Sequence, residues 1–260
     1  MTDPDGPKDK QLDPAKAVGA AGKAFAKEPR NPDKAVAYAR TLKALGEKRQ
    51  ALAVLQQAAV FNGGDRALNS EYGRLALEMD QVALAQRLLE AADEPGNPDW
   101  RVISARGTVL AKQGNYRDAI PLYERALALA PGQSSILNNL ALAHAMEGHA
   151  DQAEPLLKRA AATGQDPRVN QNLALVLGLQ GKFDEARAIA SRDLPADKAA
   201  AEVDYVRRIV MIEPRATGRP DHPEQPLARV AKSEPALPNL RGPTHDDTPG
   251  WAPNVAAMPK

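Results

Sequence analysis

The sequence has no cysteine, few aromatic residues and no long apolar run. Without cysteine, the chain as given can form no disulfide, no thiolate metal site and no lipid attachment through a thiol. No uninterrupted apolar stretch reaches the roughly 18 residues that a membrane-spanning helix needs, so we expect no direct membrane span. The opening residues MTDPDGPKDKQLDPAK carry charges but no apolar core of the kind found in secretory signals, so we expect no signal peptide there.

The chain also lacks an excess of charge of either sign. It has 34 Lys and Arg against 33 Asp and Glu, which gives a net charge of +1. Nucleic acids and anionic membranes attract basic surfaces, so we expect neither as a partner. Aromatic residues make up only 4% of the chain and alanine dominates the apolar set. We therefore expect helices that pack close together.

What the sequence does contain is a repeat of small residues in phase. One series has a spacing of 34 and then 33: Ala51, Ala85, Ala119, Ala153 and Ala186. A second keeps the spacing of 34: Ala58, Ala92, Ala126 and Ala160. A third has an aspartate where one glycine is missing: Gly46, Asp80, Gly114, Gly148 and Gly181. A fourth is always small: Ala39, Gly73, Gly107, Ala141 and Ala174. A period of 34 residues is that of the tetratricopeptide repeat (TPR), a pair of antiparallel helices.

The residue types fit this repeat physically. Small residues let each helix approach its neighbours, and a bulky side chain at such a place would overpack the contact at a cost of about 1–3 kcal/mol. The glycines of the third series can adopt the left-handed conformation that ends the first helix of each pair. The unit that begins at Trp100 is closest to the pattern, and it departs from it at Arg106, where leucine is usual.

The predicted fold class is therefore all-α: a TPR solenoid, a right-handed superhelix of antiparallel helix pairs with terminal capping helices and disordered ends. Helix starts are expected at Asn31-Pro32, Asp166-Pro167 and Asp13-Pro14, where a capping side chain precedes proline. The expected organisation is 1–13 disordered, 14–31 an N-terminal cap, 32–194 five units (32–65, 66–99, 100–133, 134–166 and 167–194), 195–212 a C-terminal cap and 213–260 a proline-rich disordered tail. That tail is either a tether or peptide ligand, or a solvated extension.

The sequence offers no constellation for catalysis. It has no phosphate-binding loop, no G-x-S-x-G elbow and no cysteine nucleophile. His144 and His149 are separated by a turn at Gly148, so we do not expect them to bind a metal, and His144 is expected to be packed and hydrogen-bonded. We predict no catalytic, cofactor-binding or metal-binding residues, no cofactor and no enzymatic activity.

The repeat geometry implies a concave groove lined by the first helix of each unit. Candidate peptide-binding residues are charged in the first two units and amide or apolar in the last two: Arg40, Arg74, Asn138, Asn139, Leu142, Met146, Gln171, Asn172 and Leu175. Asn139 and Asn172 together are predicted to bind the backbone of an extended peptide, because amides both donate and accept. The alternative, that these asparagines only solvate the groove, stays open. A clamp for a C-terminal carboxylate needs Lys and Arg on successive first helices and is not expected in the last three units, which carry Ser104, Thr108, Asn138 and Gln171 in that region.

The run from Leu137 to Val210 contains QNLALVLGLQGKFDEA and then DLPADKAAAEVDYVR. It resembles the TadD family of tight-adherence (Flp) pilus assembly proteins, and the resemblance extends from about Leu12 to Ile212. It implies an envelope-associated bacterial protein, periplasmic or at the outer membrane, that helps assemble a type IVb pilus secretion system by supporting its secretin. Such proteins commonly carry a lipoprotein leader ending at a cysteine, which this chain lacks. The expected partners are secretion or pilus proteins, and the alternative is a cytoplasmic adaptor or chaperone that binds a client peptide.

Overall fold

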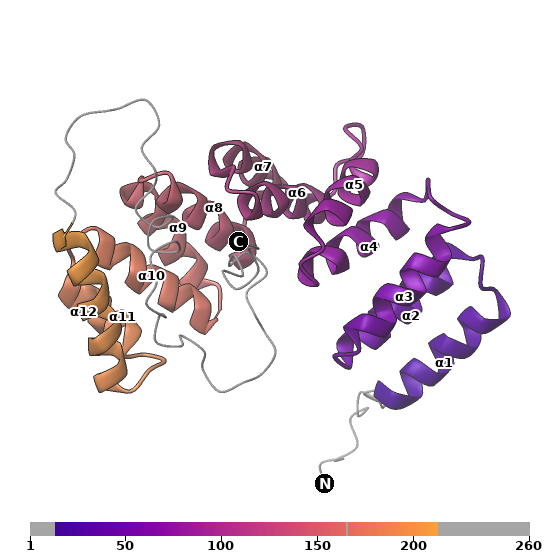
Figure 1. Ribbon diagram of the computed structural model, residues 1–260, viewed down its shortest axis with the longest axis horizontal. Coiled ribbons are helices and arrows are strands. Elements are labelled where there is room, and N and C mark those ends of the chain that lie inside the picture. Colours follow the sequence, from indigo (N-terminus) through magenta and orange to yellow (C-terminus); the bar gives the residue numbers. More distant parts are fainter. Residues whose placement is uncertain (1–13, 165, 213–260) are drawn as a thin grey trace, which may run out of the picture. The chain divides into compact units, whose positions relative to one another are not determined.

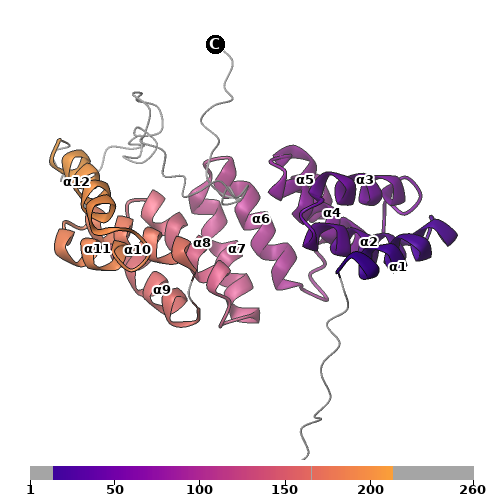
Figure 2. The same ribbon diagram turned by 90° about the horizontal axis from the view of Figure 1, so that it is seen from below.

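The computed structural model describes residues 14–164 and 166–212. This part of the chain consists of twelve α-helices and contains no strand, which confirms the all-α prediction. The segments expected to be disordered, 1–13 and 213–260, lie outside the described residues. The chain divides into two compact units, unit 1 up to Asn97 and unit 2 from Pro98. Figures 1 and 2 show the helices of each unit from two directions.

Unit 1 is built from consecutive helices that pack side by side. They are α1 (Pro14–Lys27), α2 (Pro32–Ala44), α3 (Lys48–Ala59), α4 (Arg66–Glu78) and α5 (Val82–Ala92). Each helix contacts the next one, and α2 also contacts α4. The core joins Phe25 of α1 to Leu42, Leu55 and Leu75 of the following helices. The first helices of two successive pairs, α2 and α4, therefore lie next to each other.

Unit 2 repeats this arrangement with seven helices. They are α6 (Trp100–Lys112), α7 (Tyr116–Leu129), α8 (Ser134–Met146), α9 (Ala150–Ala162), α10 (Pro167–Leu179), α11 (Phe183–Ala190) and α12 (Ala196–Ile212). Again each helix contacts the next, and additional contacts join α6 to α8, α8 to α10 and α10 to α12. The last of these contacts places α12 against α10 and α11 at the end of the described chain (Figure 1). The first helices α6, α8 and α10 thus form one continuous row.

The small residues of the repeat are buried between the helices, as the sequence predicted. All members of the two alanine series have an exposed fraction of 0%. Close approach of a neighbouring side chain also accounts for the glycine at 107, because a Cβ atom there would lie 2.9 Å from Cε1 of Tyr123. Alanine and glycine at these places set how closely neighbouring helices pack.

The turns between the paired helices share one backbone geometry. The glycines of the third series have φ between 81° and 85°, and Asp80 has φ 60° at the corresponding place. In the turn after α4, Asp80 N–H donates to Leu77 O (3.1 Å) and Gln81 N–H donates to Ala76 O (2.8 Å). This pair of bonds closes the helix with a left-handed residue, which is the conformation predicted for these glycines.

The aspartate at position 80 provides a test of this turn. A residue with a side chain is strained in the left-handed region, and glycine relieves this strain but adds entropy to the unfolded chain. The net expectation is that Asp80→Gly raises the free energy of unfolding by about 0.5 kcal/mol. The matched change, Gly114→Ala in the turn after α6, is expected to lower it by about 1 kcal/mol. Urea denaturation of both variants measures these changes. A destabilised Asp80→Gly variant would show that the aspartate is preferred there.

Helices α2, α4, α6 and α10 each start after a capping side chain. Asn31 Oδ1 accepts from the N–H groups of Asp33 (3.0 Å) and Lys34, and Asp166 accepts from the N–H of Arg168 (3.0 Å), which confirms two predicted caps. The third predicted cap, Asp13, lies outside the described residues. Sequence reasoning missed two further caps: Asp65 accepts from Leu68 N–H, and Asp99 accepts from Arg101 N–H. Neither of these aspartates precedes a proline, so the signal used for the others was absent.

Candidate functional site

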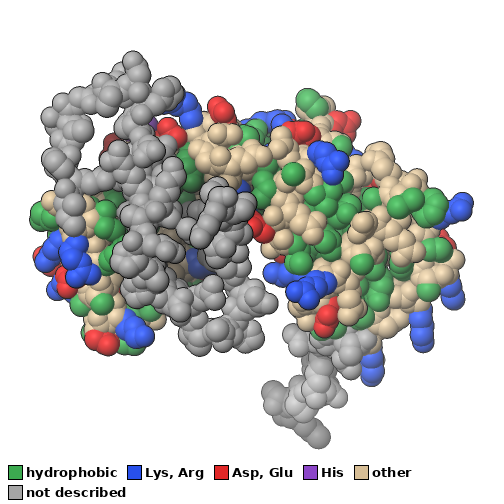
Figure 3. Space-filling view, viewed as in Figure 1, with side chains coloured by type: hydrophobic (Ala, Val, Ile, Leu, Met, Phe, Trp, Pro, Cys, Tyr) green, Lys and Arg blue, Asp and Glu red, His purple; other side chains and the backbone are tan. Residues whose placement is uncertain are grey.

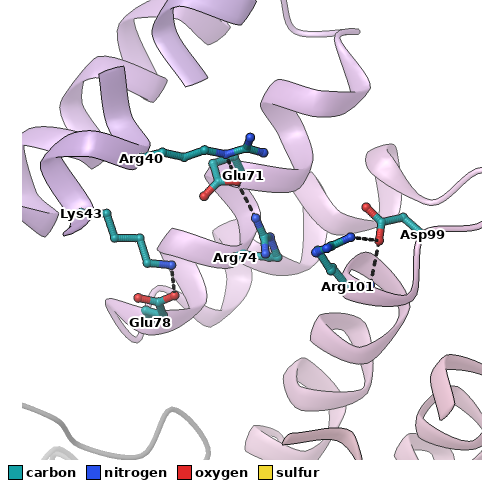
Figure 4. Close-up of polar contacts among 7 residues, drawn as sticks. All are labelled: Arg40, Lys43, Glu71, Arg74, Glu78, Asp99 and Arg101. Carbon is teal, nitrogen blue, oxygen red and sulfur yellow. Dashed lines mark hydrogen bonds and ion pairs between the residues drawn. The ribbon is translucent and has the colours of Figure 1, made fainter. Parts of the chain in front are cut away.

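A buried carboxylate joins the first helices of unit 1. Glu71 Oε2 of α4 accepts from Arg40 Nε of α2 at 3.0 Å and from Arg74 Nη2 of its own helix at 2.5 Å (Figure 4). The side chain of Glu71 is only 5% exposed, whereas that of Arg40 is 62% exposed. The two arginines predicted from the sequence are therefore brought together by an acidic residue that lies beneath them.

The charges around Glu71 keep it ionised. Burial raises the pKa of the Glu71 carboxyl, but Arg74, Arg40 and Lys43 together outweigh burial and hold the pKa below its ordinary value. Because the folded pKa is lower than the unfolded one, these ion pairs stabilise unit 1 above the ordinary carboxyl pKa. That contribution is lost as the pH falls through the lowered value.

A second ion pair lies beside the first. Lys43 Nζ of α2 binds Glu78 Oε1 of α4, and Lys48 Nζ at the start of α3 lies 3.7 Å from Glu78 Oε2. In Figure 4, Arg40 and Lys43 both extend from α2 toward acidic partners on α4. We call the six residues of these two clusters the charged face: Arg40, Lys43, Lys48, Glu71, Arg74 and Glu78.

Unit 2 has a row of neutral polar side chains on its first helices instead. Asn172 Nδ2 of α10 donates to Asn138 Oδ1 of α8 at 2.7 Å. Asn138 Nδ2 lies 3.4 Å from Asn139 Oδ1, and Asn139 Nδ2 lies 3.5 Å from Thr108 Oγ1 of α6. Tyr123 of α7 donates its hydroxyl to the same Thr108 oxygen at 3.2 Å. We call the four residues Thr108, Asn138, Asn139 and Asn172 the amide face.

The hydrogen bonds of the amide face are unequal in strength. Only the bond from Asn172 to Asn138 has the usual length for an N–H···O bond, and the two bonds made through Asn139 are at the long limit. Asn172 Oδ1 has no donor among the described residues, and each amide nitrogen has a second N–H. Thr108 and Asn138 are buried, whereas Asn139 and Asn172 are half-buried. The amides of Asn139 and Asn172 can therefore both donate to and accept from a polypeptide backbone.

The sequence-predicted residues fall into two groups. Arg40 and Arg74 belong to unit 1, and the other seven belong to unit 2. Within unit 2, Gln171 is exposed, Met146 and Leu175 are half-buried, and Leu142 is 4% exposed. The hydrogen bond from Asn172 goes to Asn138 rather than to Asn139, with which it was predicted to act. The spacing of 34 residues between 138 and 172 is the repeat period, which is a signal that could have found this pair.

His144 differs from its prediction. It is half-buried on α8, but its Nδ1 atom is buried with no hydrogen-bond partner among the described residues, so the expected hydrogen bond at this atom is wrong. Its ring lies 6.4 Å from that of His149. Burial and the charge of His149 lower the pKa of His144, against the opposing effect of Glu124 and Asp151. The lowered pKa favours the neutral imidazole, so the buried Nδ1 atom without a partner does not have to carry a proton and its charge.

The described residues hold no cluster of three or more His, Cys, Asp or Glu side chains that could bind a metal ion. Across 14–164 and 166–212, every helix is too short or too polar to cross a membrane.

Comparisons with known proteins agree with the repeat architecture. Family models described as tetratricopeptide repeat match residues 110–175 and 172–192. No curated protein matches the chain. These two stretches cover most of α7 to α10 and α11, all within unit 2.

Several solved structures have a similar fold at low sequence identity. A chain of the APC/C hetero-tetramer Cut9-Hcn1 is 19% identical, with a TM-score of 0.61 over 73% of this chain, which spans only 39% of that one. PilF of Pseudomonas aeruginosa is 20% identical, with a TM-score of 0.60 over 74% of this chain and 89% of that one. PilW, a widely conserved type IV pilus biogenesis factor, is 17% identical, with a TM-score of 0.58 over 78% and 88%.

The buried small residues, the shared turn geometry, the repeat matches and these structures agree. The chain contains tetratricopeptide repeats and has the all-α fold of TPR proteins.

Proposed function

We propose that the chain is a non-enzymatic scaffold that binds an extended segment of a protein partner on its amide face, and that it serves in assembly of a Flp-type tight-adherence pilus. The observation that carries the binding proposal is the polar row formed by the Thr108 hydroxyl on α6 and the asparagine amides on α8 and α10. These side chains come from three successive repeats, so they match a partner segment that runs across the helices. An extended backbone offers N–H and C=O groups in alternation, which asparagine amides can meet.

The hydrogen bonds within the amide face can be exchanged at little cost for hydrogen bonds to a partner. The two long bonds made through Asn139 contribute little, so replacing them by shorter bonds to a peptide costs little. Each new hydrogen bond contributes about 0.5–1.5 kcal/mol net. Met146 and Leu175 lie half-buried on the same two helices, α8 and α10, and an unbranched methionine adapts to varied apolar side chains.

Assembly of a pilus is proposed from two sources that agree. The run Leu137 to Val210, which resembles the TadD family, forms α8 to α12 and includes three residues of the amide face. Two of the similar solved structures, PilF and PilW, are pilus-related by name. The proposed partner is a protein of the pilus export machinery, with the outer-membrane secretin as the first candidate.

The proposal predicts a specific loss of partner binding. The double variant Asn139→Ala plus Asn172→Ala, expressed with an affinity tag in the native bacterium, is expected to recover at least about tenfold less secretin than the unchanged chain, because two or more hydrogen bonds are removed. The matched control is Asn170→Ala, the same change on the same helix α10. Asn170 donates to Asp193 at 2.8 Å and takes no part in the amide face. Recovery with this control is expected to stay unchanged.

Circular dichroism of the purified variants shows whether each one is folded. Undiminished secretin recovery by the folded double variant would remove the amide face as the binding surface. Fractionation of the tagged chain tests the pilus assignment separately. If it is found in the cytoplasm with no pilus protein, the chain is instead an adaptor that binds a client peptide.

A further inference from the structure

The charged face of unit 1 has more positive than negative groups, and one of its two carboxylates, Glu71, is buried. Four cations, Arg40, Lys43, Lys48 and Arg74, surround two carboxylates, Glu71 and Glu78. Glu71 is almost fully covered, while Arg40 extends into solvent. In the space-filling view, Lys and Arg side chains project at several places around unit 1 and fewer Asp and Glu side chains are visible there (Figure 3). Arg40 is the most exposed of the six residues, so a partner that approaches this face meets its guanidinium group first.

The position of Arg40 leaves part of its guanidinium group available. Glu71 accepts from Nε, so the outer edge with Nη1 and Nη2 is not used by this bond, and neither atom has an acceptor among the described residues. That outer edge is the pair of parallel N–H donors that fits a carboxylate in a bidentate manner. Because Glu71 already fixes the side chain, a ligand that binds the outer edge immobilises little further rotamer freedom.

We propose that the charged face binds an acidic peptide segment of a protein partner. One carboxylate of the segment binds the outer edge of Arg40, and another lies near the ammonium groups of Lys43 and Lys48. This site lies in unit 1 and uses charge, so it goes beyond the amide face of unit 2 and does not depend on it. It is also distinct from a clamp for a chain terminus, because the side chains of Asp and Glu supply the carboxylates.

The composition of the face favours a peptide over a nucleic acid. Four cations with two interleaved carboxylates would repel part of a continuous phosphate backbone, and none of the six residues is an aromatic on which a base could stack. A short segment with separated carboxylates fits cations that are separated by acidic groups. The attraction is electrostatic and exposed to solvent, so it weakens as salt is added.

The test uses two synthetic peptides of equal length, one with alternating Glu and Ala and one with Gln in place of every Glu. Binding to the full chain is followed by NMR, through the arginine Nε–Hε signals and the backbone amides, at low and high salt. The Glu peptide is expected to shift the Arg40 signal with saturation and the Gln peptide to leave it unchanged. No saturable shift with the Glu peptide, or equal shifts with both peptides, would overturn the proposal.

Variants separate this site from a general effect of charge. Arg40→Gln is expected to weaken binding of the Glu peptide about tenfold, because it removes charge-assisted hydrogen bonds. Glu71 keeps Arg74 as a partner in this variant, so the fold is retained, and the melting temperature checks this. Arg49→Gln removes the same charge from an exposed residue of α3 that lies outside the charged face, and it is expected to change binding less than twofold.

Two further variants identify which interaction is lost. Arg40→Lys keeps the charge but loses the paired donors, so its affinity is expected to lie between those of Arg40→Gln and the unchanged chain. Asn139→Ala plus Asn172→Ala is expected to bind the Glu peptide normally, which keeps this test independent of the amide face. Equal losses in Arg40→Gln and Arg49→Gln would show nonspecific attraction and contradict the proposal.

Discussion

Replacing Gly73 with valine is expected to destabilise unit 1 by about 3 kcal/mol, because the site has no room for a side chain. A Cβ atom at Gly73 of α4 would lie 2.8 Å from Cγ of Leu89 and 3.2 Å from Cβ of Leu88, both on α5. The Cβ atom of Leu88 is fixed by the backbone of α5, and the side chain of Leu89 is fully buried and has little room to rotate away. The helix pair would have to move apart and lose contacts along its whole length.

Urea denaturation followed by far-UV circular dichroism measures this loss. The control is Gly19→Ala in α1 of the same unit, where an added Cβ meets no atom within 4 Å. Glycine is a poor residue inside a helix, so this control is expected to stabilise the unit by about 0.5–1 kcal/mol. Opposite signs for the two variants are the expected pattern. A Gly73→Val variant as stable as the unchanged chain would mean that α4 and α5 do not pack this closely.

Replacing Tyr123 with alanine is expected to destabilise unit 2 by about 3–5 kcal/mol, the usual cost of removing a buried aromatic ring. Tyr123 of α7 is 1% exposed and packs in a cluster with Ile103 of α6 and Ile136 of α8. Its ring also lies directly against Gly107, so it fills the space that this glycine leaves open. The cavity left by alanine would remove contacts from three helices.

The conservative change Tyr123→Phe separates packing from hydrogen bonding. It keeps the ring and removes only the bond from the Tyr123 hydroxyl to Thr108, so we expect a loss of about 1 kcal/mol. The same denaturation experiment measures both variants. A similar loss for Phe and Ala would show that the hydroxyl, and not the ring, stabilises this cluster.

The repeat predicted the fold because its small residues determine how closely the helix backbones approach each other. Alanine and glycine recur where helices touch, and such a requirement is visible as a period without knowledge of any contact. The same pattern predicted that Asp80 takes the place of a turn glycine, and its φ of 60° confirms this. The division of the chain between Asn97 and Pro98 was not predicted, because the repeat period continues through it unchanged.

The sequence alone predicted less of the candidate site than of the fold. The pattern identified which helix faces carry Arg40, Arg74 and the asparagines, but side-chain partners depend on rotamers and on the stagger between helices. Asn172 reaches Asn138 and not Asn139 for this reason. The burial of Glu71 beneath two arginines also depends on how α2 and α4 approach, and no local signal distinguishes it from an exposed glutamate. His144 shows the same limit, since its open Nδ1 atom reflects the surroundings of the folded chain.

The two faces have different chemistry in one chain. The amide face of unit 2 offers neutral donors and acceptors that suit the backbone of a partner, while the charged face of unit 1 offers fixed positive groups that suit acidic side chains. Backbone recognition depends little on the partner's sequence and only weakly on salt. Recognition of acidic side chains selects a composition and weakens with salt. Because binding at the two faces depends differently on salt, affinities measured at low and high salt distinguish one face from the other.

The central claim is that the first helices of unit 2 bind a protein partner in the cell. Site-specific photo-crosslinking tests it most directly, with a photoreactive amino acid at position 171, where the exposed Gln171 lies beside the amide face. The control position is 158, the exposed Lys158 on the second helix α9. We expect a crosslink to a pilus export protein from position 171 and none from 158. Equal crosslinking from both positions, or none from 171 while the partner still co-purifies, would contradict it.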